Sequence, residues 1–184
     1  RAAAPVEWRR RRAADERATA SVRPARQARR SPMPSISNTA SARFALPADR
    51  LYLTDRHVWV QLDDEIATVG VTAPLREALD YTPEIDFWAV DRVEVGDTLA
   101  TVGGRDGHVV AIAAPVAGWL IELNEVLERA PQALLSQPYK LGWVARVAPE
   151  NWDRDAARLV GAGRYREALD RRHHSLAEAA GAEG

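Results

Sequence analysis

The stretch TVGGRDGHVVAIAAPVAG, Thr101–Gly118, decides the fold. Apolar and small residues lead into GRDGH, apolar residues resume after it, and a corner containing Pro115 ends it. Two short apolar runs around turn-forming residues are typical of a β-hairpin. The pair Asp106-Gly107 predicts a tight two-residue turn, because both central positions of a type I′ turn need positive φ. We therefore expect a hairpin whose tip is formed by residues 105–108.

Further short strands are expected on both sides of this hairpin. Alternating or short apolar runs occupy 57–62, 63–72, 86–90, 99–104, 108–114, 118–124 and 142–148. Turn residues separate them, among them Asp63-Asp64 and Gly96-Asp97. Closely spaced short strands predict a sandwich or barrel. The tryptophans on these strands are expected in its core: Trp59, Trp88, Trp119 and Trp143.

Helical patterns are short until the C-terminal part. Residues 74–81 open with Pro and predict one or two turns, and 125–135 are helical but interrupted by Pro131. Two more helices are predicted over 151–161 and 164–180, the first capped by Asn151 or Asp153. The fold class is therefore mainly β with a helical appendage (α+β).

Composition excludes several classes of function. The 184 residues include no Cys, which excludes disulfides, thiolate metal sites and Cys nucleophiles. No apolar run approaches the roughly 20 residues of a membrane helix. We expect a soluble, cytoplasmic protein that has no membrane partner. Only one of the 25 basic residues is Lys, namely Lys140, so a function that needs a reactive amine has one side chain to use.

The N-terminal part differs in kind from the rest. Residues 1–33 carry ten Arg and a net charge of +7, whereas the remainder carries −8. Residues 1–43 are rich in Arg, Ala, Ser and Pro without apolar periodicity, so we predict a disordered tail. Three origins fit it: a translation start placed upstream of Met33, a transit peptide for a mitochondrial protein, or a nucleic-acid-binding tail. We do not expect nucleic acid as a partner, because such a composition is more often a plain disordered tail.

Taken together, the motifs of the chain resemble the glycine cleavage system H-protein family. The matching residues, in family order, are Tyr52, Thr54, His57, Trp59, Val60, Ala67–Thr72, Glu77–Leu79, Val93, Gly96, Ala114–Gly118, Leu123–Leu127, Pro138, Tyr139, Gly142, Trp143, Tyr165 and Leu169. Each motif alone is weak, and the order and spacing make the set specific. The resemblance covers about residues 50–170. It implies a lipoyl/biotinyl-type β sandwich (barrel-sandwich hybrid) over 44–150, followed by C-terminal helices over 151–184.

The resemblance also implies a carrier or binding protein without its own active site. In the family a lysine at the hairpin tip holds lipoate, and the lipoyl arm visits glycine decarboxylase, aminomethyltransferase and dihydrolipoyl dehydrogenase. Those enzymes, or lipoate-handling enzymes, are therefore the expected partners.

This sequence departs from the family at that lysine. Family spacing places it at Gly107 when counted from Pro115 and at Asp106 when counted from Gly96, and the acidic residue that precedes it becomes Gly104. No cofactor is therefore expected, although lipoate is the family's cofactor.

The available substitutes are weak. His108 adjoins the tip but is expected to be a plain exposed side chain, and Arg105 cannot accept lipoate because its guanidinium stays charged. Lys140 follows Tyr139 in a different loop. No metal site is expected. The run Asp63–Glu65 is typical of a solvated turn, and His173 and His174 are adjacent, so on a helix they face about 100° apart.

The favoured interpretation is an H-protein-like binding or scaffold module that is not lipoylated. The alternatives are a conventional lipoyl carrier and a degenerate remnant without activity. An enzyme built around His108 has no support, since no base–nucleophile spacing accompanies it.

Overall fold

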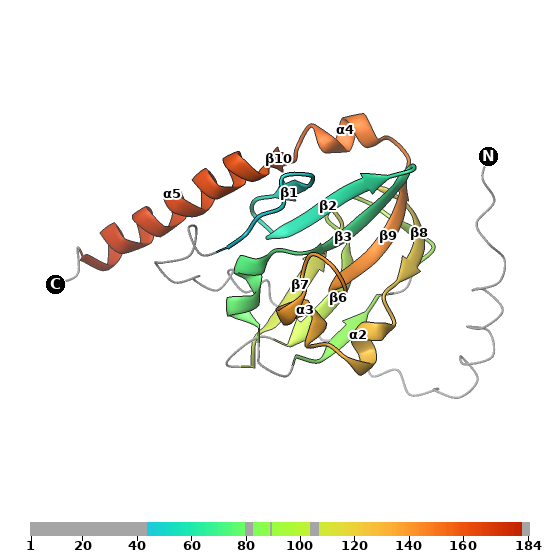
Figure 1. The fold of residues 1–184 in the computed structure, drawn as a ribbon, viewed down its shortest axis with the longest axis horizontal. Coiled ribbons are helices and arrows are strands. Elements are labelled where there is room, and N and C mark those ends of the chain that lie inside the picture. Colours follow the sequence, from blue (N-terminus) through green and yellow to red (C-terminus); the bar gives the residue numbers. More distant parts are fainter. Residues whose placement is uncertain (1–43, 80–82, 89, 104–106, 182–184) are drawn as a thin grey trace. The chain divides into compact units, whose positions relative to one another are not determined.

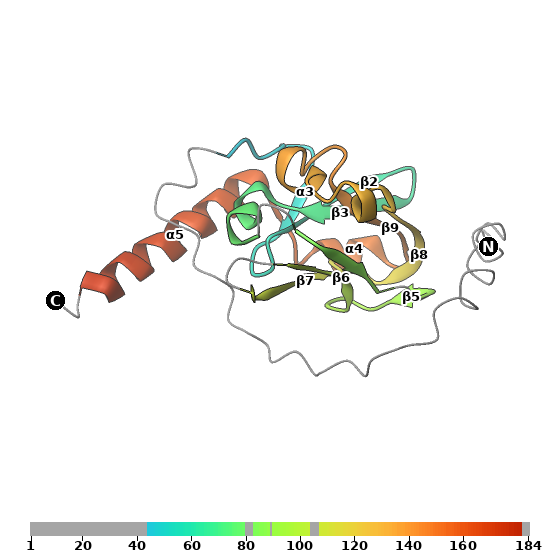
Figure 2. The same ribbon diagram turned by 90° about the horizontal axis from the view of Figure 1, so that it is seen from below.

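The computed structural model describes residues 44–79, 83–88, 90–103 and 107–181. The predicted N-terminal tail, residues 1–43, lies outside these ranges. The described chain forms two antiparallel β-sheets, which lie as two layers with β6 and β7 beneath β2 and β3 (Figure 2). This confirms the predicted β sandwich.

The larger sheet has the strand order β10-β1-β2-β3-β9-β8-β5 (Figure 1). Its strands are β1 Leu51–Leu53, β2 Val58–Asp63, β3 Ile66–Val71, β5 Arg92–Val93, β8 Gly118–Leu123, β9 Trp143–Pro149 and β10 Val160–Gly161. The short strands β1, β5 and β10 had no clear sequence signal, because two or three residues cannot show a period. They form by pairing: β1 pairs with the longer β2, β5 with the longer β8, and β10 with β1.

The smaller sheet has the order β4-β6-β7, with β4 Ile85–Phe87, β6 Thr98–Gly103 and β7 Val109–Ala113. Strands β6 and β7 are the hairpin that the opening stretch predicted. Buried side chains of both sheets meet in one apolar core that includes Val60, Val69, Leu99, Ile112 and Val147. The alternation of the strands produces this core, since every second side chain of a strand faces the same side.

Helices connect the strands and follow the sandwich. They are η1 Ala73–Ala78 (a 3₁₀ helix), α2 Val126–Arg129, α3 Ala133–Ser136, α4 Trp152–Ala156 and α5 Ala162–Gly181. The interruption at Pro131 is confirmed, because α2 ends before it and α3 begins after it. Asn151 is the cap of α4, and its side chain accepts a hydrogen bond from the Arg154 amide.

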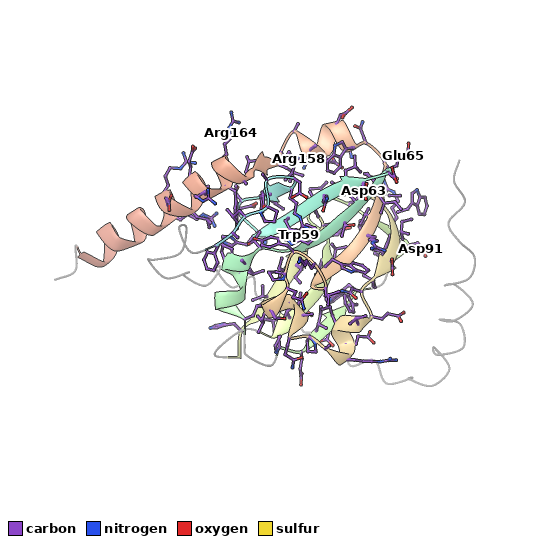
Figure 3. All side chains as sticks on the ribbon, viewed as in Figure 1. Trp59, Asp63, Glu65, Asp91, Arg158 and Arg164 are labelled. Carbon is purple, nitrogen blue, oxygen red and sulfur yellow. The ribbon has the colours of Figure 1, made fainter. Side chains whose placement is uncertain are left out.

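Two boundary predictions were wrong. The helix expected over 151–161 stops at Ala156, because Val160 and Gly161 leave it to pair with β1. The turn placed at Asp63-Asp64 lies one residue later: Asp63 still pairs with Ile66, and Asp64 and Glu65 form the connection with φ of 43° and 67°. Figure 3 shows Asp63 and Glu65 together at this turn. Asp64 and Glu65 therefore adopt the positive-φ conformation that is usually found for Asn-Gly or Asp-Gly in such turns.

Candidate functional site: the β6–β7 hairpin

The register of the hairpin fixes the length of its tip. Val102 pairs with Val110 and Gly103 pairs with Val109, so five residues connect the last pair. The pairing of the two strands is symmetric about position 106. Asp106 of the predicted turn lies outside the described residues, and Gly107 has the positive φ expected of it, 72°.

The described part of the tip is open to solvent. Gly107 and His108 are exposed, and Val109 is 59% exposed. A Cβ added at Gly107 would meet no atom within 4 Å. Gly104, Arg105 and Asp106, three of the residues singled out from the sequence, lie outside the described residues. The part that is described offers an accessible surface and no primary amine.

A buried carboxylate holds the corner through which β7 leaves the hairpin. Asp155 of α4 accepts a hydrogen bond from the Ala117 amide at 2.9 Å. Arg154 and Arg158 pair with the same carboxylate at 2.9 and 3.2 Å, and the Asp155 side chain has no exposed surface. Burial opposes the charged form of Asp155, but the hydrogen bonds from Arg154 and Ala117 outweigh it and lower the pKa of the carboxyl.

The corner also requires a glycine at its last position. A Cβ on Gly118 would overlap the carbonyl oxygen of Ala148 on the neighbouring strand β9. The preceding residues are tied to the other side of the hairpin, because the Ala114 amide donates to the Asp97 carbonyl and the Gly96 amide donates to Ala114. The base of the hairpin is thus fixed by backbone hydrogen bonds, close packing and one buried charge.

Sequence reasoning missed a buried polar cluster under α5. The Tyr165 hydroxyl lies 2.6 Å from Nδ1 of His57 and 2.9 Å from the hydroxyl of Thr72. The Tyr165 ring stacks on Tyr52 at 4.8 Å between ring centroids. Tyr52, His57 and Tyr165 all belong to the motifs of the family resemblance, but motif membership assigned them no role. Here they join α5 to strand β1 and to the turn that precedes β2.

The prediction that all four strand tryptophans are buried was wrong for two of them. Trp59 is 1% exposed, whereas Trp88 is 48% and Trp119 49% exposed. Side chains alternate along β8: Gly118 is buried, so the next residue, Trp119, faces outward. An indole on the outer face of a sheet is an unusual use of so large an apolar side chain.

The remaining candidates carry no site in the described part of the chain. No group of three or more potential metal ligands lies together there, and no described helix is both long and apolar enough to cross a membrane. Asp63, Asp64 and Glu65 form the exposed β2–β3 turn. His173 and His174 are on α5 without described side-chain positions.

The chain's lysine is not part of the β6–β7 hairpin. Lys140 is exposed in the turn between α3 and β9, where its amide donates to the Gln137 carbonyl. No residue of β6, β7 or their connection is a lysine. The family resemblance implies lipoate held as an amide of a lysine amine in this hairpin, and whether this chain carries it stays a prediction.

Two antiparallel sheets, a hairpin with an exposed end and a helix after the sandwich define a lipoyl-type β-sandwich protein. The sequence profile of the glycine cleavage H-protein family matches residues 51–172, and the chain belongs to that family. The family consists of carrier proteins and not of enzymes. This confirms the resemblance seen in the sequence.

Individual relatives agree with the profile. The glycine cleavage system H protein of Listeria welshimeri is 33% identical over 133 residues, which cover 69% of this chain and all of that protein. The H protein of Thermus thermophilus is 34% identical over 126 residues, 68% of this chain and 96% of the relative. The crystal structure of an H protein from Mycobacterium marinum matches with a TM-score of 0.57 and 26% identity, covering 65% of this chain and 95% of that one.

Proposed function

We propose that this member of the H-protein family acts as a binding or scaffold module and carries no lipoyl group. Its partners are enzymes of the glycine cleavage system or of lipoate handling, which the family's role suggests. The observation that carries the proposal is the lysine count: the only Lys of 184 residues is Lys140, and it is not in the β6–β7 hairpin.

Lys140 is a poor substitute for a lysine at the hairpin tip. It belongs to a compact turn in which the amides of both Lys140 and Gly142 donate to the Gln137 carbonyl. A Cβ at Gly142 would lie 2.5 Å from the Ala133 carbonyl oxygen, so the turn packs tightly against α3. A ligase that recognises a lysine at the tip of a hairpin would not find that geometry around Lys140.

The intact packing supports a binding module over a degenerate remnant. The hairpin's inward side chains Ala100, Val102 and Ile112 are at most 1% exposed. At the base of the hairpin, the buried Asp155 carboxylate is paired with Arg154 and accepts a hydrogen bond from the Ala117 amide. Loss of function without selection on the fold would be expected to leave cavities or unpaired buried charges here.

Binding to purified enzymes tests the proposal. We expect the full chain to bind aminomethyltransferase or glycine decarboxylase in isothermal titration calorimetry, with no lipoate supplied. A lipoylated H protein from a relative serves as the positive control. Absence of binding to both enzymes, with the control binding, would contradict the scaffold function and favour the remnant.

A lysine restored to the tip separates loss of the amine from loss of the recognition surface. We expect Gly107→Lys or Asp106→Lys to gain partial lipoylation by a lipoate ligase, followed by intact mass, with Lys140→Arg in the background. The Gly107 variant should also lose about 1 kcal/mol of stability, because an L-residue at φ 72° is strained. If neither folded variant is modified, the surface around the tip has changed as well as the lysine.

A further inference from the structure

The outer face of the smaller sheet is built from directly paired rows. Asp86 pairs with Thr101, and Thr101 pairs with Ala111. In the row nearer the tip the Gly103 amide donates to the Glu84 carbonyl, and Gly103 pairs with Val109. Because side chains alternate along a strand, the residues of both rows share one side of the sheet. We call this side the hairpin face.

Side chains on the hairpin face are sorted by chemistry. Glu84, Asp86 and Trp88 follow one another at alternate positions along the β4 edge, and all three are exposed. Thr101 and Gly103 lie in the middle, and exposed Val109 and Ala111 follow the β7 edge. No described residue forms an ion pair with Glu84 or Asp86. The hairpin face is therefore acidic along the β4 edge and apolar along the β7 edge. The small side chains in its middle project little from the sheet.

Gly103 is not required by the fold. Its φ is not positive, and a Cβ there would meet only the Glu84 backbone at 3.6 Å, which is ordinary contact. Glycine inside a strand costs about 0.5–1 kcal/mol relative to alanine. In the strands of other proteins, a glycine often marks a site where another backbone or a ligand approaches closely. The glycine at 103 keeps the centre of the hairpin face open.

We propose that the hairpin face docks a partner protein through arginine or lysine side chains of that partner. This rests on the proposed function, because it names how the scaffold would hold its partner. Cations of the partner meet Glu84 and Asp86 and can stack on the Trp88 indole, which is 48% exposed. Apolar atoms of the partner cover Val109 and Ala111.

Charge disfavours a two-fold dimer of this chain in which the hairpin face meets itself. In a two-fold dimer the same surface meets itself, and the described residues of the hairpin face carry no Lys or Arg to receive Glu84 and Asp86. Like charges brought together across an interface cost several kcal/mol. The acidic edge therefore selects a partner of opposite charge.

Charge reversal on the face is the first arm of the test. Glu84→Arg/Asp86→Arg should weaken binding of the full chain to aminomethyltransferase or glycine decarboxylase by at least about tenfold in calorimetry, because attraction becomes repulsion. The matched control, Glu167→Arg/Asp170→Arg on the exposed side of α5, makes the same charge change and should stay within about twofold. Arginine is used so that no new lysine enters the chain.

Gly103→Gln is the second arm, and it separates docking from folding. The side chain fills the open centre, so partner binding should weaken by about fivefold or more while the melting temperature stays the same or rises. A merely structural role for Gly103 predicts the opposite, a lower melting temperature. If the enzymes bind both face variants with wild-type affinity, docking through the hairpin face is wrong and the proposed function stands.

A peptide probe decides the case in which neither enzyme binds. A six-residue peptide of alternating Arg and Val, and its Glu-Val counterpart, are titrated into the 15N-labelled full chain. Shifts of the amides of 84–88 and 109–111 with the Arg peptide alone would support the face although the proposed function had failed. Shifts elsewhere, or none, would overturn the proposed docking surface.

Discussion

At the scale of the residue, the β6–β7 hairpin has no lysine side chain. Gly107 and His108 stand at the described part of a tip where an amine is expected, and no packing constraint forces glycine there. That the hairpin contains no lysine can be read from the sequence, because it is a matter of residue identity. Trp88 was misplaced, since alternation tells which residues share a face but not which face is covered.

The Tyr165 hydroxyl should contribute measurably to stability. Tyr165→Phe removes its interactions with both His57 and Thr72 inside a site where Tyr165 has no exposed surface. We expect the free energy of unfolding in urea to fall by about 1–3 kcal/mol. Tyr52→Phe, which loses one bond to the partly buried Pro47 carbonyl, should cost less. Equal losses in the two variants would contradict the buried cluster.

The β2–β3 turn offers a stabilising substitution. Glu65 has a φ of 67°, a conformation that costs an L-residue about 1–2 kcal/mol and a glycine almost nothing. Glu65→Gly should therefore raise the melting temperature by a few degrees in scanning calorimetry. The control is Glu128→Gly in helix α2, which should lower it. A destabilised Glu65→Gly would show that the Glu65 side chain contributes more than its backbone strain costs.

At the scale of the element, both strands of the hairpin were predicted from the sequence. The alternation in β6 and β7 located both strands, whereas the five-residue tip depends on which residues pair. That register is set by the buried side chains Val102, Val110 and Ile112 and by the corner after β7. Turn statistics at Asp106-Gly107 contain no information about those long-range contacts, which is why the register could not be predicted from the sequence.

Helix α4 should stabilise the corner in a pH-dependent way. The pKa of Asp155 is lowered in the folded protein, so its contribution is present above the unfolded pKa of about 3.9 and is lost as pH falls through the folded pKa. Asp155→Asn should cost about 2 kcal/mol in urea at pH 7 and flatten the loss of stability in acid. Exposed Asp153→Asn on the same helix should change little at either pH. An unchanged acid profile in the Asp155 variant would contradict this role.

At the scale of the whole molecule, ordered motifs predicted the family and the sandwich better than periodicity predicted its edges. Strands β1, β5 and β10 close the larger sheet with only two or three residues each, and the sequence has no room to show them. The chain thus keeps an H-protein architecture around a hairpin without the attachment amine. The account predicts that this protein has kept the family's fold but does not carry the family's lipoyl cofactor.

The mass of the intact protein tests this claim most directly. The full chain is co-expressed with a lipoate ligase and supplied with lipoate, beside an H protein that has a tip lysine. The account predicts the unmodified mass for this chain and a lipoyl adduct for the control. A lipoyl adduct on this chain, mapped by peptide sequencing to Lys140 or to any other residue, would contradict it.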